Sequence, residues 1–402
     1  MGFLLKIFFA TCFSFYLTRS AIFKVLCISS KQNVSMKYLP LLMALVFAAS
    51  CSQPIEIPQK EASAVTYQNP LLMLTEGLKK GRADSTTMWG IDMGLTKDEL
   101  LDQVSRMDKE VLMKKELPEW SIKNFWQIPL LYYAQSSDEE PLNLLALNTG
   151  GDKLDFIVAR PIRGSEMPIE EDQQEKDYRY LFVTTQLSLL KNRHGEPHYI
   201  ASNYAVPKIL GGLSSSYHTG VAYLWFIQNK TIALIDVPLN YVVIHAFSPD
   251  SYPSPGQMML IANLFNTPNV YNLWNIPFPE RPVSASRLEK GLEDEGFYVG
   301  LDKLYDSKYP EFVVERNHPY NSLKFLSIPS GWYIKGLTKQ GEPLTEDHRK
   351  WNADTKRKLI EKQSAPHYTS DDGKVSYWLH NGYITQFKEN DNSLEIAYLQ
   401  IY

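Results

Sequence analysis

The stretch NRHGEPHYI, Asn192 to Ile200, holds three side chains that commonly bind metal ions: His194, Glu196 and His198. The zinc-protease motif H-E-x-x-H places two histidines one helical turn apart, with a glutamate directly after the first. Here Glu196 is not next to His194, and Pro197 stands between Glu196 and His198, where a helix would be broken. The segment is therefore either a metal site of another kind or the end of a helix.

A second copy of this segment favours the structural interpretation. The tripeptide Pro-His-Tyr returns at Pro366, and both copies follow two apolar runs joined by turn residues and then an acidic segment. Both are followed by a strand-like run that contains tryptophan. We match these downstream residues as Trp225-Phe226 with Tyr377-Trp378, and Asn229 with Asn381. The shared order of landmarks indicates an internal duplication.

The duplication predicts an α+β fold with two tandem related modules, each a hairpin, a helix and an antiparallel meander. Acidic residues near 170–172 and 346–347 mark the helix starts, and Thr345 is a suitable N-cap. Each helix stops at a joint, where a proline begins the next strand and Gly195 adopts a left-handed conformation. The expected joint residues are Gly195, Pro197, His198, Pro366 and His367.

We expect no metal at this joint. His194 has no counterpart in the second copy, where Gln363 takes its place, so the two histidines are not a repeated ligand set. A histidine site also needs convergent partners. We expect no cofactor elsewhere either, because no P-loop, G-x-G-x-x-G, H-E-x-x-H or G-x-S-x-G motif occurs.

Before the first module, GLTKDELLDQV carries a capping box, Thr96 with Glu99, and a hydrophobic staple, Leu95 with Leu100. A helix that opens GLTKDEL, followed later by glycine-x-proline and a strand meander, resembles the small outer-membrane lipoproteins of the BamE/SmpA family. The resemblance covers short patches only. It implies a role in cell-envelope assembly.

The segment MKYLPLLMALVFAASC, Met36 to Cys51, has a short basic start, an apolar run and small residues before the cysteine. It resembles a bacterial lipoprotein signal peptide with its lipobox. The resemblance implies that Cys51 is diacylated and becomes the new N-terminus, and Ser52 after it implies the outer membrane. The alternative is an ordinary cleaved signal peptide with an incidental cysteine.

These features predict six parts of the chain. Met36 supplies a complete signal, so the preceding residues are interpreted as an upstream extension that is not translated, although Met1 remains the alternative start. The predicted parts are 1–35 as this extension, 36–50 as the signal peptide, 51–66 as a lipidated tether, 67–264 as the first module with an N-terminal helical extension, 265–283 as a Pro/Asn-rich linker and 284–402 as the second module.

Composition limits the partners. All three cysteines lie within the first 51 residues, which excludes disulfides and cysteine nucleophiles from the remainder. The first fifty residues contain five basic and no acidic residues, so the remainder is more acidic than the formal net charge of −4 for the whole chain. We therefore expect no nucleic-acid partner. The membrane, through the lipid anchor, and an envelope protein or a glycan are the expected partners.

Two groups of residues could carry further chemistry. Ser214, Ser215 and Ser216 near His218 could supply a nucleophile, although a Ser/Gly-rich loop explains them as well. Trp225, Trp332 and Trp378 are expected in the core, whereas exposed tryptophans could stack on sugars. We expect a non-catalytic binding or assembly protein, with a glycan-binding module as the alternative and an uncharacterised hydrolase as the third interpretation.

Overall fold

The computed structural model describes residues 69–83, 87–107, 111–113, 120–122, 125–133, 141–150, 152–162, 172–205, 219–265, 272–273, 276–277, 285–299, 311–328, 331–380 and 383–400. Cys51, the predicted signal peptide and the tether lie outside these residues, as do Ser214 to Ser216, His218 and most of the predicted linker. The predicted parts of the chain therefore remain predictions.

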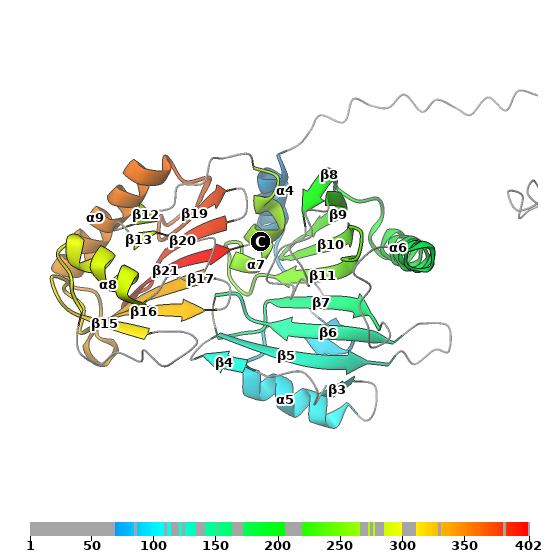
Figure 1. Cartoon of the computed structure of the whole chain (residues 1–402), viewed down its shortest axis with the longest axis horizontal. Coiled ribbons are helices and arrows are strands. Elements are labelled where there is room, and N and C mark those ends of the chain that lie inside the picture. Colours follow the sequence, from blue (N-terminus) through cyan, green and yellow to red (C-terminus); the bar gives the residue numbers. More distant parts are fainter. Residues whose placement is uncertain are drawn as a thin grey trace, which may run out of the picture. The chain divides into compact units, whose positions relative to one another are not determined.

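The first antiparallel sheet has the strand order β3-β5-β6-β7-β11-β10-β9-β8, with β4 paired to β5 (Figure 1). The hairpin β6–β7 precedes helix α6, and the meander β8 to β11 returns so that β11 pairs with β7. The strands are β3 Val111–Met113, β4 Trp120–Ile122, β5 Phe125–Tyr132, β6 Leu142–Leu147, β7 Phe156–Pro161, β8 Tyr199–Ala205, β9 Thr219–Ile227, β10 Lys230–Asp236 and β11 Val242–Phe247.

The second antiparallel sheet repeats this order as β14-β15-β16-β17-β21-β20-β19-β18 (Figure 1). Here the hairpin β16–β17 precedes helix α9, and β21 returns to pair with β17. The strands are β14 Tyr298–Val299, β15 Glu311–Arg316, β16 Ser322–Ile328, β17 Gly331–Leu337, β18 Tyr368–Thr369, β19 Val375–His380, β20 Tyr383–Glu389 and β21 Ser393–Gln400. The α+β fold with two related modules is confirmed.

Equivalent residues also share the same register. In the first sheet His245 on β11 pairs with Ile157 and Ile232. In the second sheet Tyr398 on β21 pairs with Trp332 and Thr385 in the same way. The paired strands of the two modules therefore have structural counterparts, and these positions can be compared one by one.

The long helices begin where acidic segments were expected. Helix α6 spans Gln173–His194 and its N-cap Asp172 accepts a hydrogen bond from the backbone N–H of Glu175. Helix α9 spans Glu346–Gln363 and its N-cap Thr345 accepts from the N–H of His348. Such side chains satisfy donors that the first helical turn leaves free. Thr345 was predicted as an N-cap, whereas Asp172 was predicted only as part of the acidic segment at the helix start.

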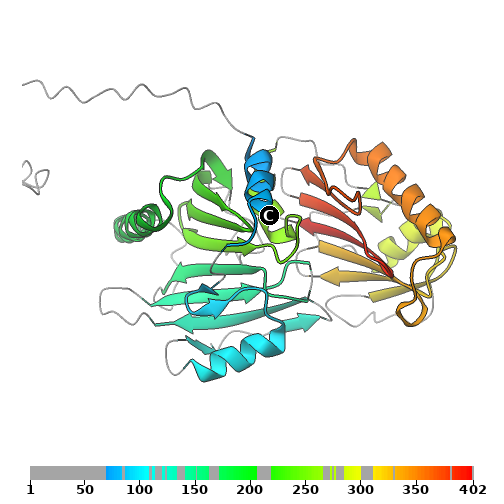
Figure 2. The same cartoon turned by 180° about the vertical axis from the view of Figure 1, so that it is seen from behind.

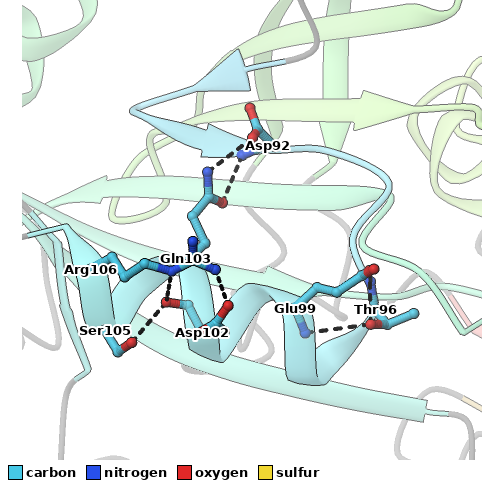
Figure 3. Close-up of polar contacts among 7 residues, drawn as sticks. All are labelled: Asp92, Thr96, Glu99, Asp102, Gln103, Ser105 and Arg106. Atoms are coloured by element: carbon cyan, nitrogen blue, oxygen red, sulfur yellow. Dashed lines mark hydrogen bonds and ion pairs between the residues drawn. The ribbon is translucent and has the colours of Figure 1, made fainter.

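Helix α5, Lys97–Arg106, has the expected capping box, in which Thr96 accepts from the N–H of Glu99 and the Glu99 carboxylate accepts from the N–H of Thr96 (Figure 3). From the middle of α5, Gln103 reaches the small hairpin of β1 (Thr87–Met88) and β2 (Ile91–Asp92). Its amide accepts from the N–H of Asp92 and donates to the Asp92 carboxylate and to the Gly90 carbonyl. These bonds tie the hairpin to α5.

Three further helices were not predicted. Helix α4, Pro70–Lys79, lies against β9 (Figure 2), and α8, Ala285–Asp294, contributes Leu292 to the core of module two. Helix α7, Pro255–Ala262, has all eight residues buried and packs against β10 and β11 of the first sheet and β19 and β20 of the second. The remaining short elements are β12 Asn272–Leu273, β13 Ile276–Pro277 and the 3₁₀ turn Lys339–Gly341.

Both faces of the first sheet are buried. Along β10, Ile232 and Leu234 point to a core beneath α5 and α6, whereas Ala233 and Ile235 point to a core that also contains α4 and α7. This second core includes Tyr377, Ile384 and Leu399 of module two. The three tryptophans expected in the core, Trp225, Trp332 and Trp378, are buried. Among the described residues no helix has the length and apolar character needed to cross a membrane.

Candidate functional site

The expected joint has the same geometry in both modules. Gly195 at the end of α6 has φ 79° and ψ −167°, and Ser364 at the end of α9 has φ 67° and ψ −169°. The indole nitrogen of Trp225 donates to the carbonyl of Gly195 at 3.0 Å, and that of Trp378 donates to the carbonyl of Ser364 at 2.9 Å. The helix end is thus attached to the second strand of each meander.

The two joint histidines also have equivalent hydrogen bonds. Nδ1 of His198 accepts from the backbone N–H of Phe226 at 2.9 Å, and Nδ1 of His367 accepts from that of Leu379 at 3.0 Å. Each Nδ1 is therefore unprotonated and occupied. Burial lowers the pKa of both histidines, in agreement with a neutral ring.

Two details of the sequence interpretation need correction. Pro197 and Pro366 do not begin strands, because β8 and β18 start two residues later, after each histidine has bonded to the neighbouring strand. The downstream match is also shifted by one residue: the indole bonds and the sheet register equate Trp225 with Trp378, not with Tyr377. A shift of one residue would exchange the two faces of the strand.

The alternative of a metal site at the joint has no support from the geometry. Nδ1 of His198 accepts a backbone hydrogen bond, and Glu196 pairs with Lys191 at 2.7 Å. Within the described residues, no group of three histidine, cysteine, aspartate or glutamate side chains is arranged to hold a metal ion.

Helix α6, which ends at the joint, lines a cavity in module one. The cavity has a volume of about 530 Å³, within the range of small-molecule sites, and lies between α6, the β1–β2 hairpin and one face of the first sheet. Leu142, Val243 and His245 line it from the sheet. This combination of an apolar floor with one polar side chain is typical of a binding pocket.

The β1–β2 hairpin brings a tryptophan to this cavity at a cost in backbone strain. Its two-residue turn, Trp89 and Gly90, has φ values of 48° and 75°. Turns with two positive φ values favour Asn or Gly, and a bulky residue there is unusual. The indole of Trp89 packs edge-on against the ring of His245, with centroids 4.9 Å apart. Such local strain is common at functional sites.

Helix α6 supplies the wall of the cavity with a stripe of residues one turn apart, Leu181, Thr185, Leu189 and Arg193. Leu181 is 56% exposed and Leu189 is 43% exposed. Because Gly195 matches Ser364, the corresponding residues on α9 are Lys350, Asp354, Lys358 and Lys362. Leu181 and Leu189 thus stand where module two has exposed lysines, whereas Arg193 and Lys362 are both cationic.

His245 is the titratable group at the floor of the cavity. Its side chain is buried, and its Nδ1 has no hydrogen-bond partner among the described residues. Burial lowers its pKa well below 6.5, and the nearby side chains of His194, Lys230 and Arg193 lower the pKa further. In module two, Tyr398 takes this position and is also buried, and Gln363, the counterpart of His194, forms a hydrogen bond with His380 at 3.0 Å.

The sequence analysis did not identify this site. Of the residues quoted there, only His194 lies close to it, and as a neighbour of His245 rather than as a metal ligand. The missed residues are Trp89, Leu189, Arg193 and His245. The sequence signal that indicates this site is the difference between the two helices, because α6 has leucine where α9 has lysine at matched positions.

Comparison with protein-family models, with curated protein sequences and with solved structures gives no match.

Proposed function

We propose that the protein is a lipid-anchored binding protein of the bacterial cell envelope, and that the cavity of module one binds a small molecule without chemical change. The observation that carries this proposal is the difference between the modules. At the rim of the cavity of about 530 Å³ in module one, α6 has Leu181 and Leu189, whereas module two has Lys350 and Lys358 at the matched helix positions.

The strained backbone of Trp89 supports the same proposal, since the strain places an aromatic ring on the cavity wall.

Binding is favoured over catalysis by the environment of His245. A general base must become positively charged as it accepts a proton, and a carboxylate usually stabilises that charge. The charged neighbours of His245 are cationic instead, and no described residue that lines the cavity is acidic. His245 is therefore a poor base at neutral pH.

The proposed cellular location is the outer membrane, to which acylation of Cys51 would anchor the protein. Mass spectrometry of the protein from its native membrane should find diacylglycerol on Cys51, and Cys51→Ser should leave the protein unprocessed or unanchored. An unmodified Cys51 would contradict the lipid anchor, but would leave the proposal for the cavity intact.

The binding role is tested by filling the cavity. Thr185→Trp places a large side chain on the face of α6 that lines the cavity, and Asp354→Trp makes the same change at the matched position of α9. Native mass spectrometry should find a small molecule that co-purifies with the unaltered protein and with Asp354→Trp but not with Thr185→Trp. Equal retention by both variants would contradict a binding role for this cavity.

A further inference from the structure

The lining of the cavity indicates the class of molecule that fits it. The structure assigns to the module-one cavity an amphipathic organic anion, with an apolar body against the sheet and α6 and its one anionic group at Arg193. This inference rests on the proposed binding function and adds the chemical class of the ligand.

Apolar side chains line the cavity at its floor and at its rim, beside polar ones. Leu142 and Val243 form the floor, Phe182 and Leu190 are buried on the inner side of α6, and Leu189 extends the apolar surface outward. Apolar area removed from water contributes roughly 25 cal/mol per Å², so this surface favours an alkyl or aromatic body.

The charge at the rim has one sign. Arg193 lies in the last turn of α6, its side chain is solvent-exposed, and it has no carboxylate partner within the described part of the chain. Lys230 and His194 lie close enough to act electrostatically on the same region, since both lower the pKa of His245. A guanidinium binds carboxylate or phosphate groups through two parallel hydrogen bonds.

The absence of acidic residues from the described lining separates this ligand class from two others. A cationic ligand would meet only positive charge. A neutral sugar would find hydroxyl partners in the lining but would leave the charge of Arg193 without a counter-ion. An anion with an apolar body meets a complementary group at each end.

The test uses four probes with the same ten-carbon chain: decanoate, decyl phosphate, decanol and decyltrimethylammonium. Isothermal titration calorimetry with the acylated full-length protein should give dissociation constants at least about tenfold lower for one of the two anions than for decanol, and no measurable binding of the cation. The comparison of decanoate with decyl phosphate distinguishes a carboxylate from a phosphate head group.

Two variants in the cavity and one matched control on α9 locate the binding. Arg193→Gln should raise the dissociation constant of the preferred anion about tenfold and leave that of decanol unchanged, and Lys362→Gln, at the matched position of α9, should change neither. Leu189→Gln, which removes the apolar side chain without adding a charge, should weaken decanol and both anions alike. Arg193 and Leu189 are exposed on α6, so these variants should keep the melting temperature.

The outcomes separate this inference from the proposed function. Equal affinity for decanol and both anions, or an Arg193→Gln variant without effect on the anions, would overturn the anionic class but keep a binding cavity. Binding of a sugar oligomer that Thr185→Trp abolishes, with no binding of any decyl probe, would also overturn the class alone. Failure of every probe together with no co-purified molecule would overturn both.

Discussion

At the scale of single residues, the two copies place different amino acids in the same positive-φ conformation at the joint. A positive φ with ψ near 180° is a region that only glycine adopts without strain. Gly195 satisfies that requirement, whereas Ser364 adopts the same conformation with a side chain exposed to solvent. The strain at Ser364 is therefore not offset by packing of its own side chain.

Exchanging these two residues gives opposite effects on stability. Gly195→Ser should lower the free energy of unfolding by about 1–3 kcal/mol, and because no atom lies within 4 Å of the added Cβ, the cost arises from the backbone alone. Ser364→Gly should raise the free energy of unfolding by up to about 1–2 kcal/mol, after the entropy that glycine adds to the unfolded chain. Urea unfolding of both variants checks the pair, and a destabilised Ser364→Gly would contradict it.

A buried carboxylate gives a second prediction at this scale. Asp155, in the β6–β7 connection, accepts from the backbone N–H of Thr149 at 2.8 Å and from its hydroxyl at 2.5 Å. Burial nevertheless raises the pKa of Asp155 from 3.8 to about 7. The folded protein therefore binds more protons than the unfolded chain between these values, and its stability falls as the pH rises from about 4 to about 7.

Asp155→Asn should remove this dependence, because the amide retains an acceptor for Thr149 without a charge to desolvate. The variant should gain stability relative to the unaltered protein between pH 5 and pH 8. Comparing the difference between the two proteins at each pH cancels the contribution of the histidines, whose lowered pKa values act in the opposite direction below pH 6.5. A difference that does not change with pH would show that Asp155 is ionised throughout.

At the scale of elements, the β1–β2 hairpin depends on α5 for its position. Gln103 makes three hydrogen bonds to the hairpin, and Figure 3 draws those to Asp92. The hairpin presents Trp89 to the cavity. A two-stranded hairpin alone is marginal in water. Gln103 is therefore expected to position Trp89 for binding, although it is not among the described residues that line the cavity.

Gln103→Leu should speed hydrogen exchange at Asp92 and raise the dissociation constant of a bound decyl probe about tenfold. Ser105→Ala is the matched control, because Ser105 bonds only to the Asp102 carbonyl on its own helix. Faster exchange at Asp92 without a change in affinity would show that the position of the hairpin does not matter for binding.

Of the three helices that the sequence did not predict, α7 has a clear physical reason. Helix α7 is apolar on every side because it is wholly buried, so it lacks the periodic pattern that identifies a surface helix. Its capping box, Ser254 with Gln257, and Pro255 at the first position were the readable signals. Helices α5 and α9 were predicted correctly because their N-terminal caps can be recognised in the sequence.

At the scale of the whole molecule, the region Tyr67–Tyr402 forms one compact unit, because α7 contributes to a core that includes residues of both modules. The hydroxyl of Tyr377 in module two donates to the carbonyl of Pro253, just before α7, at 2.9 Å. The duplication was predictable from repeated tripeptides, but this shared core was not, since contacts between modules leave no repeated pattern in the sequence.

A single cooperative unfolding transition is therefore expected for this region. Met259→Asp places an unpaired charge in the shared core and should separate calorimetric unfolding into two transitions, one for each module. Leu72→Asp, on the 58% exposed side chain of α4, should leave one transition at nearly the same temperature. Two transitions in the unaltered protein would contradict a shared core.

The central claim is that the duplicated fold has become a binding site in module one only, with His245 at its floor. Nuclear magnetic resonance of ¹⁵N-labelled histidine rings during titration with decanoate tests this claim most directly, with His245→Tyr used to assign the signal. We predict that the ring signals of His245 shift with ligand, while those of His367 and His380 in module two stay in place. Unchanged His245 signals at saturating decanoate, or shifts confined to the module-two histidines, would contradict the claim.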